Sequence, residues 1–342
     1  MKVSSLHFTA FAVGMLLVGF FGHGANERLG RRRSLWVAAF GISLGSVILL
    51  TGQTAVLTIG ASFCMGLVGS LILIIIPSAL SDQYGEMRAV ALSEANVISL
   101  LIVTAAPLMV GWCANLPVGW RLALGMAALV PFLMRLGFGN PSLPEPATPS
   151  ADSDSARSSL PLLFWVYWQA IVLAVSVEFC MISWSADYLE KSLSMPRVSA
   201  AQSVSLFLAA MIFGRMAVSR LVQRFEAYRV VIVSVVVAGI GFALFWLTDT
   251  ALLGQVGLFL TGLGVAGQYP LLLSLAIGVA KNNSTQATAR TTLASGTAIL
   301  ALPLLLGRLA DMTGIRQVYG VVGFLLVGVF LIALAARRKD SI

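Results

Sequence analysis

The chain has 342 residues, of which 58% are hydrophobic and only 11% are charged, and its mean hydropathy is +0.92. A soluble domain carries roughly a quarter charged residues, so this composition excludes an ordinary soluble protein and predicts a chain that crosses a membrane many times. The net charge is +8. In a membrane protein an excess of Lys and Arg marks the loops that lie on the cytoplasmic side. The positive charge therefore does not indicate a nucleic-acid partner.

Apolar segments near the ~20 residues that a helix needs to cross a bilayer follow one another along the chain. The eleven predicted spans are 7–26, 35–53, 55–80, 89–111, 120–138, 161–186, 200–222, 229–248, 251–280, 290–310 and 317–336. Between the fifth and sixth spans lies a stretch rich in Pro, Ser and Asp, which is typical of a flexible linker. We therefore expect an all-α membrane protein with an N-terminal half at 1–138, a linker at 139–160 and a C-terminal half at 161–342.

The Lys and Arg residues of the short loops predict the orientation in the membrane. Most of them, including Arg28, Arg88, Arg224 and Lys281, fall on the side of the loop at 27–34, and cytoplasmic loops are the ones that carry this excess. The odd number of spans then places the N-terminus outside and the C-terminus in the cytoplasm. We expect a multi-pass protein of the cell membrane, of the bacterial plasma-membrane type, that works in the lipid bilayer as a monomer.

The two halves repeat one another at an offset of 196 residues without a gap. The matched positions are Met15 with Met211, Arg28 with Arg224, Arg33 with Arg229, Gly45 with Gly241, Gly66 with Gly262, Pro107 with Pro303 and Gly111 with Gly307. A direct repeat of half a chain is one way in which transporters are built. The segment from Leu160 to about Tyr188 has no counterpart, because its partner would precede Met1, so we expect one helix of the repeated unit to be missing at the front.

The loop after the first span, residues 23–32 (HGANERLGRR), resembles the signature of the major facilitator superfamily between its second and third helices, GxLADRxGRR. A degenerate copy occupies 219–225 in the other half. The resemblance covers the whole chain and implies a transporter with two helical halves, in which 1–138 corresponds to helices two to six and 161–342 to helices seven to twelve. It implies secondary active or facilitated transport of a small organic solute, with protons as a candidate second substrate, by alternating access between the halves.

Two alternatives stay open: a truncated, non-transporting member of this fold, and a proton-coupled exporter of drugs or metabolites. Members that exchange drugs for protons carry an Arg four residues before a Gly in the fourth helix, and here Ser62 precedes Gly66. They also carry GPxxGG in the fifth helix, where residues 106–111 read APLMVG. Both departures count against the exporter.

The sequence contains little that would support an enzyme. Residues 262–267 (GLGVAG) fit the dinucleotide-binding pattern GxGxxG, but they lie inside a long apolar segment, where small residues let membrane helices approach closely. Zinc-hydrolase, serine-hydrolase and paired CxxC motifs are missing. We therefore expect no catalytic residue, no metal and no cofactor.

Ionisable residues inside spans are the best site candidates, because each costs roughly 2.5–3.5 kcal/mol at the bilayer centre unless it is partnered. Glu178 is the deepest charge, and we expect it to bind a polar solute or to take a proton; a purely structural pairing is the alternative. Gln268 and Tyr269 precede Pro270, which frees a backbone carbonyl for a substrate hydroxyl. Trp184 offers a flat surface for a sugar or an aromatic ring, or else belongs to the interfacial aromatic belt.

A second group of residues is expected to control conformational change. The resemblance places Glu94 and Arg215 on facing helices, where they would form a cytoplasmic gate, unless Arg215 merely extends to the lipid interface. Glu27 would interact with the helix start that carries Arg290, by the resemblance and by the helix dipole. The remaining members are the basic residues and the glycine of the 23–32 loop, whose alternative role is only to set topology: Arg28, Gly30, Arg31 and Arg32.

Overall fold

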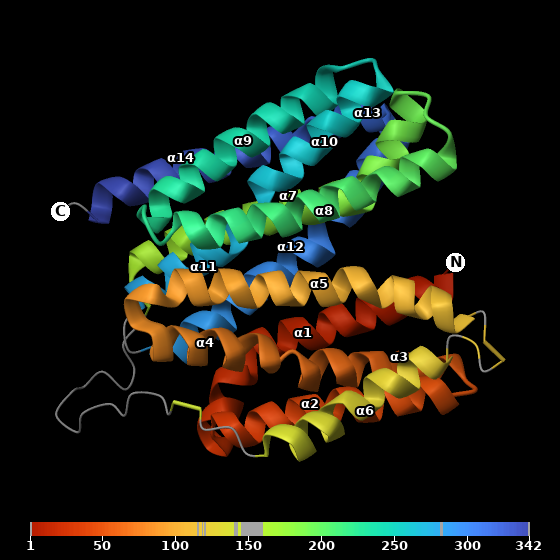
Figure 1. Ribbon diagram of the computed structural model, residues 1–342, viewed down its shortest axis with the longest axis vertical. Coiled ribbons are helices and arrows are strands. Elements are labelled where there is room, and N and C mark those ends of the chain that lie inside the picture. The colour runs from red at the N-terminus through yellow and green to blue at the C-terminus, as the bar shows by residue number, and fades with distance from the viewer. Residues whose placement is uncertain are drawn as a thin grey trace. The chain divides into compact units, whose positions relative to one another are not determined.

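The computed structural model describes residues 2–114, 116–117, 119, 121–139, 143–144, 160–280 and 283–340. Most of the predicted linker at 139–160 lies outside these residues. Within them the chain forms helices and no strand (Figure 1). The elements are α1 (Lys2–Leu29), α2 (Arg31–Thr51), α3 (Ala55–Cys64), η1 (Met65–Gly69), α4 (Ile72–Tyr84), η2 (Gly85–Met87), α5 (Arg88–Ala114), α6 (Arg121–Phe138), α7 (Leu162–Ser192), α8 (Arg197–Leu221), α9 (Ala227–Leu247), α10 (Ala251–Val265), α11 (Gln268–Val279), α12 (Ser284–Thr313), α13 (Ile315–Tyr319) and α14 (Val321–Asp340).

The helices form two compact units that differ from the expected halves at two places. Unit 1 consists of Met1–Gln83, Leu101–Ser159 and Lys281–Gly296, and unit 2 of Tyr84–Leu100, Leu160–Ala280 and Thr297–Ile342. The first part of α5 thus packs with unit 2, and the first part of α12 packs with unit 1. The division at 1–138 and 161–342 remains a prediction about the repeat.

In unit 1, α1 packs against α3 and the π-helical turn η1, and α2 packs against α6. The apolar core contains Val18, Ala38, Ile74 and Ile75, all of them buried. The two isoleucines come from α4, whose apolar residues are spaced so that one face points into the unit.

In unit 2, α10 packs against α9 and α8, and α14 packs against α7. The core includes an aromatic cluster in which the ring of Tyr188 lies 4.8 Å from Phe245 and 5.1 Å from Tyr319. The Tyr188 hydroxyl donates to the carbonyl of Trp246 at 2.7 Å, so this buried polar group is satisfied.

The sequence repeat produces the same close helix crossing in each unit. A Cβ at Gly66 would lie within 3.0 Å of the backbone of Phe11, and a Cβ at Gly262 would lie equally close to the carbonyl oxygen of Phe207. Both residues of the second crossing stand 196 positions after those of the first. Glycine is required at these crossings because a side chain would collide with backbone. The GLGVAG segment therefore serves helix packing.

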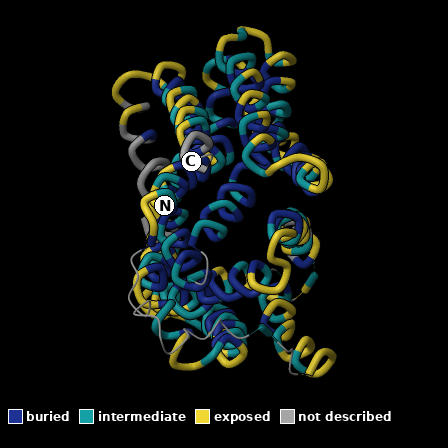
Figure 2. Tube along the Cα trace, turned by 90° about the vertical axis from the view of Figure 1, so that its left-hand side faces the viewer, coloured by how far each residue is buried: buried dark blue, intermediate teal, exposed yellow. Residues whose placement is uncertain are grey.

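The described residues contain nine helical segments that are long and apolar enough to cross a membrane. One of them, Ala55–Ala106, has 52 residues and includes most of the predicted spans 55–80 and 89–111, so the count of eleven remains a prediction. Large apolar side chains are strongly exposed, among them Leu136 at 82% and Phe324 at 79%. Figure 2 shows exposed and buried residues alternating along individual helices. This pattern is that of a multi-pass membrane protein whose outer helix faces contact lipid.

Candidate functional site

Arg215, in the last third of α8, is the centre of a polar cluster inside unit 2. Its Nη2 lies 3.4 Å from Oε1 of Glu178 on α7, and its Nη1 donates to the carbonyl of Asn96 on α5 at 3.1 Å. The side chains of Arg215 and Glu178 are only 7% and 15% exposed. Two of the three charges predicted inside spans, Glu178 and Arg215, thus form a shielded ion pair, which is the arrangement that makes such charges tolerable inside a membrane.

The third partner of Arg215 is the carbonyl that Pro270 leaves free. The predicted span 251–280 is interrupted where α10 ends at Val265 and α11 begins at Gln268. Pro270 has no N–H, so the carbonyl of Ala266, four residues earlier, has no helical donor. Arg215 Nε donates to this oxygen at 3.3 Å. The sequence suggests a substrate hydroxyl as the partner of the freed carbonyl; in the structure the guanidinium uses it and is thereby tied to the break between α10 and α11 as well as to α7 and α5.

Gln268 lies next to this arrangement and is completely buried. Its Nε2 donates to the carbonyl of Gly264 at 3.4 Å, only two residues before the carbonyl that Arg215 uses. Among the described residues its Oε1 has no hydrogen-bond partner. A buried amide oxygen without a donor is costly, by about 1–3 kcal/mol, and a ligand or a water molecule that donates a hydrogen bond would remove this cost.

Glu94 does not pair with Arg215, and that expectation is corrected. Oε1 of Glu94 instead accepts a hydrogen bond from the hydroxyl of Ser219 at 3.2 Å, one turn beyond Arg215 on α8. The two residues line a cavity of about 280 Å³ with Arg220 and Gln223. The charged acceptor of Arg215 is Glu178 because the first half of α5 presents the Asn96 backbone, and not the Glu94 carboxylate, to the guanidinium.

The two aromatic candidates occupy different environments. Trp184 packs half-buried against the apolar core of unit 2, and its buried Nε1 has no hydrogen-bond partner in the part of the chain that the structure describes. Tyr269 is half-buried beside Gln268. Trp184 follows Glu178 by six residues on α7, which corresponds to about 9 Å along the helix axis.

A second polar cluster lies in unit 1 around Arg31, the first residue of α2. Its guanidinium Nη2 lies 2.5 Å from Oδ2 of Asp82 on α4 and 3.1 Å from the hydroxyl of Thr285 at the start of α12. The hydroxyl of Ser284 bridges Arg31 and Asp82, because it accepts from the guanidinium and donates to the carboxylate. The Arg31 side chain is only 1% exposed. One guanidinium therefore ties together the ends of three helices.

The other residues of the 23–32 loop take simpler positions. Gly30 connects α1 to α2 with φ of 78°, a conformation that favours glycine. Arg28 and Arg32 are exposed. Glu27 does not contact Arg290 as expected: it lies 3.4 Å from His23 on its own helix, while Arg290 lies over the ring of Phe20 at 5.9 Å. The contact with the start of α12 is made by Arg31 instead.

Several residues of these clusters were not expected from the sequence. They are Asp82, Asn96, Ser219, Ser284 and Thr285. Asp82 had a signal, since it is an acid at the boundary of two apolar spans. Ser284 and Thr285 stand just before a predicted span, where a helix start is expected. Asn96 contributes only its backbone carbonyl to Arg215, so no residue-type pattern identifies it.

The arrangement around Arg215 offers several hydrogen-bonding groups to a polar solute. It combines a carboxylate, a guanidinium, two backbone carbonyls and the free amide oxygen of Gln268. These groups can exchange hydrogen bonds or a proton with a polar solute.

The fold has clear relatives among solved structures. The fucose:proton symporter of Escherichia coli aligns with 98% of this chain and 91% of its own, at a TM-score of 0.82 and 14% sequence identity. A human organic anion transporter aligns with 96% of this chain and 83% of its own, at a TM-score of 0.76 and 17% identity. A bacterial homologue of the iron transporter ferroportin aligns with 100% and 91%, at a TM-score of 0.70 and 15% identity. At such identities the likeness concerns the fold alone.

Sequence comparison gives the family directly. An uncharacterised MFS-type transporter of Yersinia pestis is 27% identical over 161 residues, which are 47% of this chain and 42% of that protein, so the aligned part spans less than half of the relative's length. The sequence model of the Major Facilitator Superfamily matches residues 2–289 and, in a second match, residues 170–341. With its apolar helices, its internal repeat and these matches, the chain belongs to the Major Facilitator Superfamily of membrane transporters.

Proposed function

We propose that this chain moves a small organic solute across the cell membrane by secondary active or facilitated transport, through alternating access between its two repeated halves. The N-terminus lies outside and the C-terminus in the cytoplasm, as the distribution of Lys and Arg predicts. The observation that carries the proposal is the shielded pair of Glu178 and Arg215, with the free amide oxygen of Gln268 nearby.

A buried cluster of polar and charged groups lowers the stability of a fold and is expected only where it has a function. Removing one partner of a buried ion pair typically costs about 3–5 kcal/mol, and apolar residues of similar volume stabilise a fold equally well or better. A chain that keeps a carboxylate, a guanidinium and an unsatisfied amide in one place inside its spans gains a polar binding site in return. We infer that the solute carries a hydrogen-bond donor that reaches Gln268.

The first experiment identifies the solute and tests the site together. The purified chain is screened for thermal stabilisation against a library of metabolites, since a ligand at 100 times its Kd contributes about 2.7 kcal/mol to stability. Hits are repeated with Gln268→Leu and, as a control, with Glu190→Gln on α7. We expect Gln268→Leu to lose the stabilisation and the control to keep it. A hit that survives Gln268→Leu would place the solute elsewhere.

The second experiment concerns the proton. We propose that Glu178 carries it when the solute is driven by a pH gradient. In proteoliposomes Glu178→Gln, which mimics a permanently neutral carboxyl, should abolish accumulation driven by pH while leaving downhill exchange of labelled solute intact. If accumulation by the variant keeps the pH dependence of the unmodified chain, Glu178 has a structural or binding role only.

A further inference from the structure

Two adjoining cavities on unit 2 form a continuous surface site where α9 and α14 leave the membrane. The first, of about 460 Å³, is an apolar groove between these two helices, with Phe242, Phe324 and Phe330 in its lining. The second, of about 640 Å³, lies at the end of the groove, and its lining includes the charged residues Lys191 and Arg316. Trp246 and Leu247 line both cavities, so the two are neighbours.

The depth of the groove follows from the candidate spans. The span Ala227–Leu247 ends, and the span Ile315–Ala336 begins, at residues that line the charged cavity. The apolar groove therefore runs at the level of the lipid chains, and the charged cavity lies at the membrane surface. Trp246 stands at the junction, where tryptophan is enriched in membrane proteins.

The groove is hollow because three of its positions have no side chain. Gly239 on α9, Gly323 on α14 and Gly320 before it all line it. A Cβ at Gly239 would meet no atom within 4 Å, so the space beside this residue is open. The stacked rings of Phe242 and Trp246, 6.1 Å apart, give the groove a stiff aromatic wall.

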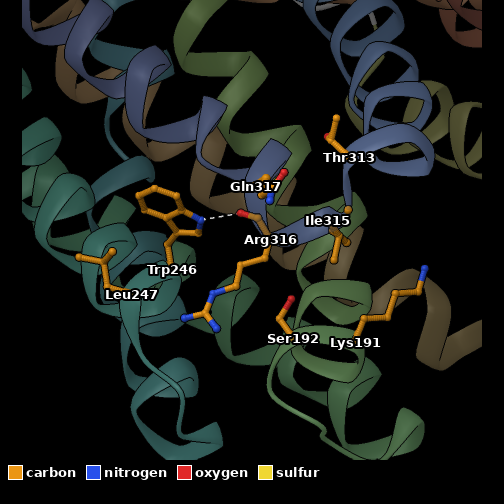
Figure 3. Close-up of a pocket in the computed structure, with 9 residues that line it drawn as sticks. Lys191, Ser192, Trp246, Leu247, Thr313, Ile315, Arg316 and Gln317 are labelled. Carbon is orange, nitrogen blue, oxygen red and sulfur yellow. Dashed lines mark hydrogen bonds between the residues drawn. The ribbon is translucent and has the colours of Figure 1, made fainter.

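Trp246, which lines both cavities, is held by two hydrogen bonds. Its indole Nε1 donates to the backbone carbonyl of Arg316 at 2.7 Å (Figure 3), and its backbone carbonyl accepts from the Tyr188 hydroxyl at 2.7 Å. Figure 3 also shows the guanidinium of Arg316 beside Trp246 and Leu247, with Lys191 on the other side of Ser192.

The charged cavity has an excess of positive charge. Arg316 Nη2 lies 2.8 Å from Oδ1 of Asp249, and its side chain remains 47% exposed. One carboxylate leaves most of the five N–H donors of a guanidinium available. For Lys191 no ion pair occurs among the residues that the structure describes. The described residues lining this cavity thus contribute the cations Arg316 and Lys191, one at each side, and no carboxylate.

We propose that this surface binds one anionic phospholipid, with an acyl chain in the α9–α14 groove and its phosphate beside Arg316 and Lys191. The apolar groove accounts for the chain and the charge accounts for the head group, since Lys or Arg near the membrane surface attracts anionic lipid. The bound lipid holds α9, α13 and the end of α7 together at one face of the membrane. This site is separate from the Arg215 cluster and does not depend on the proposed transport function.

The test measures lipid retained by the purified chain. Detergent-solubilised protein is incubated with equal amounts of phosphatidylglycerol and phosphatidylcholine of identical acyl chains, and the bound lipids are counted by native mass spectrometry. We expect phosphatidylglycerol to be retained in preference. Arg316→Gln should reduce its retention about fivefold, the ratio that corresponds to ~1 kcal/mol, and Lys191→Gln, which breaks no ion pair, should act in the same direction. Arg229→Gln, which removes an exposed Arg paired with Glu226 at the other end of α9, should have no effect.

A second pair of variants tests the groove. Gly239→Leu places a side chain in the space of the acyl chain and should lower retention of both lipids. Gly125→Leu on α6 is the matched control, because a Cβ there also meets no atom within 4 Å. Equal retention of the two lipids, displacement of phosphatidylglycerol by soluble glycerol phosphate, or unchanged binding by Gly239→Leu would each overturn the proposal.

Discussion

Arg31 and Asp82 are 51 residues apart in the chain, and their side chains meet at 2.5 Å in the interior of unit 1. The guanidinium is almost completely buried, and it reaches the hydroxyls of Ser284 and Thr285 as well. Of the four arginines between residues 27 and 34, the buried Arg31 is the one that joins α2, α4 and α12, while Arg28, Arg32 and Arg33 are exposed. The loop therefore combines a packing role with its role in topology.

This pair predicts a large effect of removing the carboxylate. Asp82→Asn leaves the buried Arg31 charge uncompensated, and breaking a buried pair costs about 3–5 kcal/mol; since the Asp82 side chain is 25% exposed, we expect a loss below that range. The measurement is the midpoint of thermal unfolding in detergent. Glu86→Gln, an exposed acid four residues later, should leave the midpoint unchanged. Equal midpoints for the two variants would show that the pair contributes no stability.

The contacts of Arg215 predict which carboxylate it is coupled to. A double-mutant cycle of Glu178→Gln and Arg215→Met, read as the free energy of unfolding in mixed micelles, should give a coupling energy of roughly 0.5–3 kcal/mol. The cycle of Glu94→Gln with Arg215→Met should be nearly additive, because Glu94 bonds to Ser219. The reverse ranking would restore Glu94 as the partner of Arg215.

The geometry of the guanidinium gives a further expectation. Arg215→Lys keeps the charge but replaces a planar fork by a single ammonium group on a flexible stem. Lysine cannot reach the carbonyls of Ala266 and Asn96 and the carboxylate of Glu178 in the same way. We expect the variant to fold with a lowered unfolding midpoint and to lose transport of the identified solute. Full transport by Arg215→Lys would mean that only the charge is needed.

Close helix packing predicts that alanine substitutions at Gly264 and Gly239 have different effects on stability. A Cβ at Gly264 would fall within 3.0 Å of the backbone of Ala238, whereas a Cβ at Gly239 meets nothing within 4 Å. Gly264→Ala should therefore destabilise the chain by about 1–3 kcal/mol, as overpacking does. Gly239→Ala should be neutral or slightly stabilising. Unfolding of the two variants in parallel measures the difference, and equal stability would contradict the tight crossing of α9 and α10.

The predicted orientation can be tested by labelling. In a background in which the three free cysteines, Cys64, Cys113 and Cys180, are replaced, single cysteines are placed at the exposed residues Ser194 and Gln223. An impermeant thiol reagent should react with Ser194→Cys from outside the cell, and with Gln223→Cys only after the membrane is opened. Labelling of Gln223→Cys in intact cells would reverse the assignment.

Part of the site was predictable because it depends on local sequence. A charge inside an apolar span is visible without a structure, and Glu178 and Arg215 were recognised in this way. The break before Pro270 was also predictable, since proline removes a backbone donor wherever it stands. The partner of the freed carbonyl was not, because Arg215 and Ala266 are 51 residues apart and meet only after α8 and α10 have packed.

The internal repeat predicts the packing of the helices but not their ion pairs. It predicts equal packing in the two units, and the glycine crossings at Gly66 and Gly262 agree with it. It does not predict the ion pairs: 196 residues from Arg31 stands Ala227, and 196 residues before Arg215 stands Gly19. The two halves therefore share their packing and differ in their charges.

The sequence by itself determined the apolar spans, the repeat, the Arg-rich loop and hence the family. Hydropathy, charge spacing and glycine positions are local properties, and the bilayer selects apolar helical spans and the orientation of basic loops by these properties alone. Only the tertiary structure decided that Arg31 binds Asp82 and Ser284, that Glu178 binds Arg215, and that Glu94 binds Ser219. These pairs join residues between 37 and 253 positions apart. In an interior with few polar groups, a charge pairs with whichever partner the packed helices bring within reach, and that choice is a property of the fold.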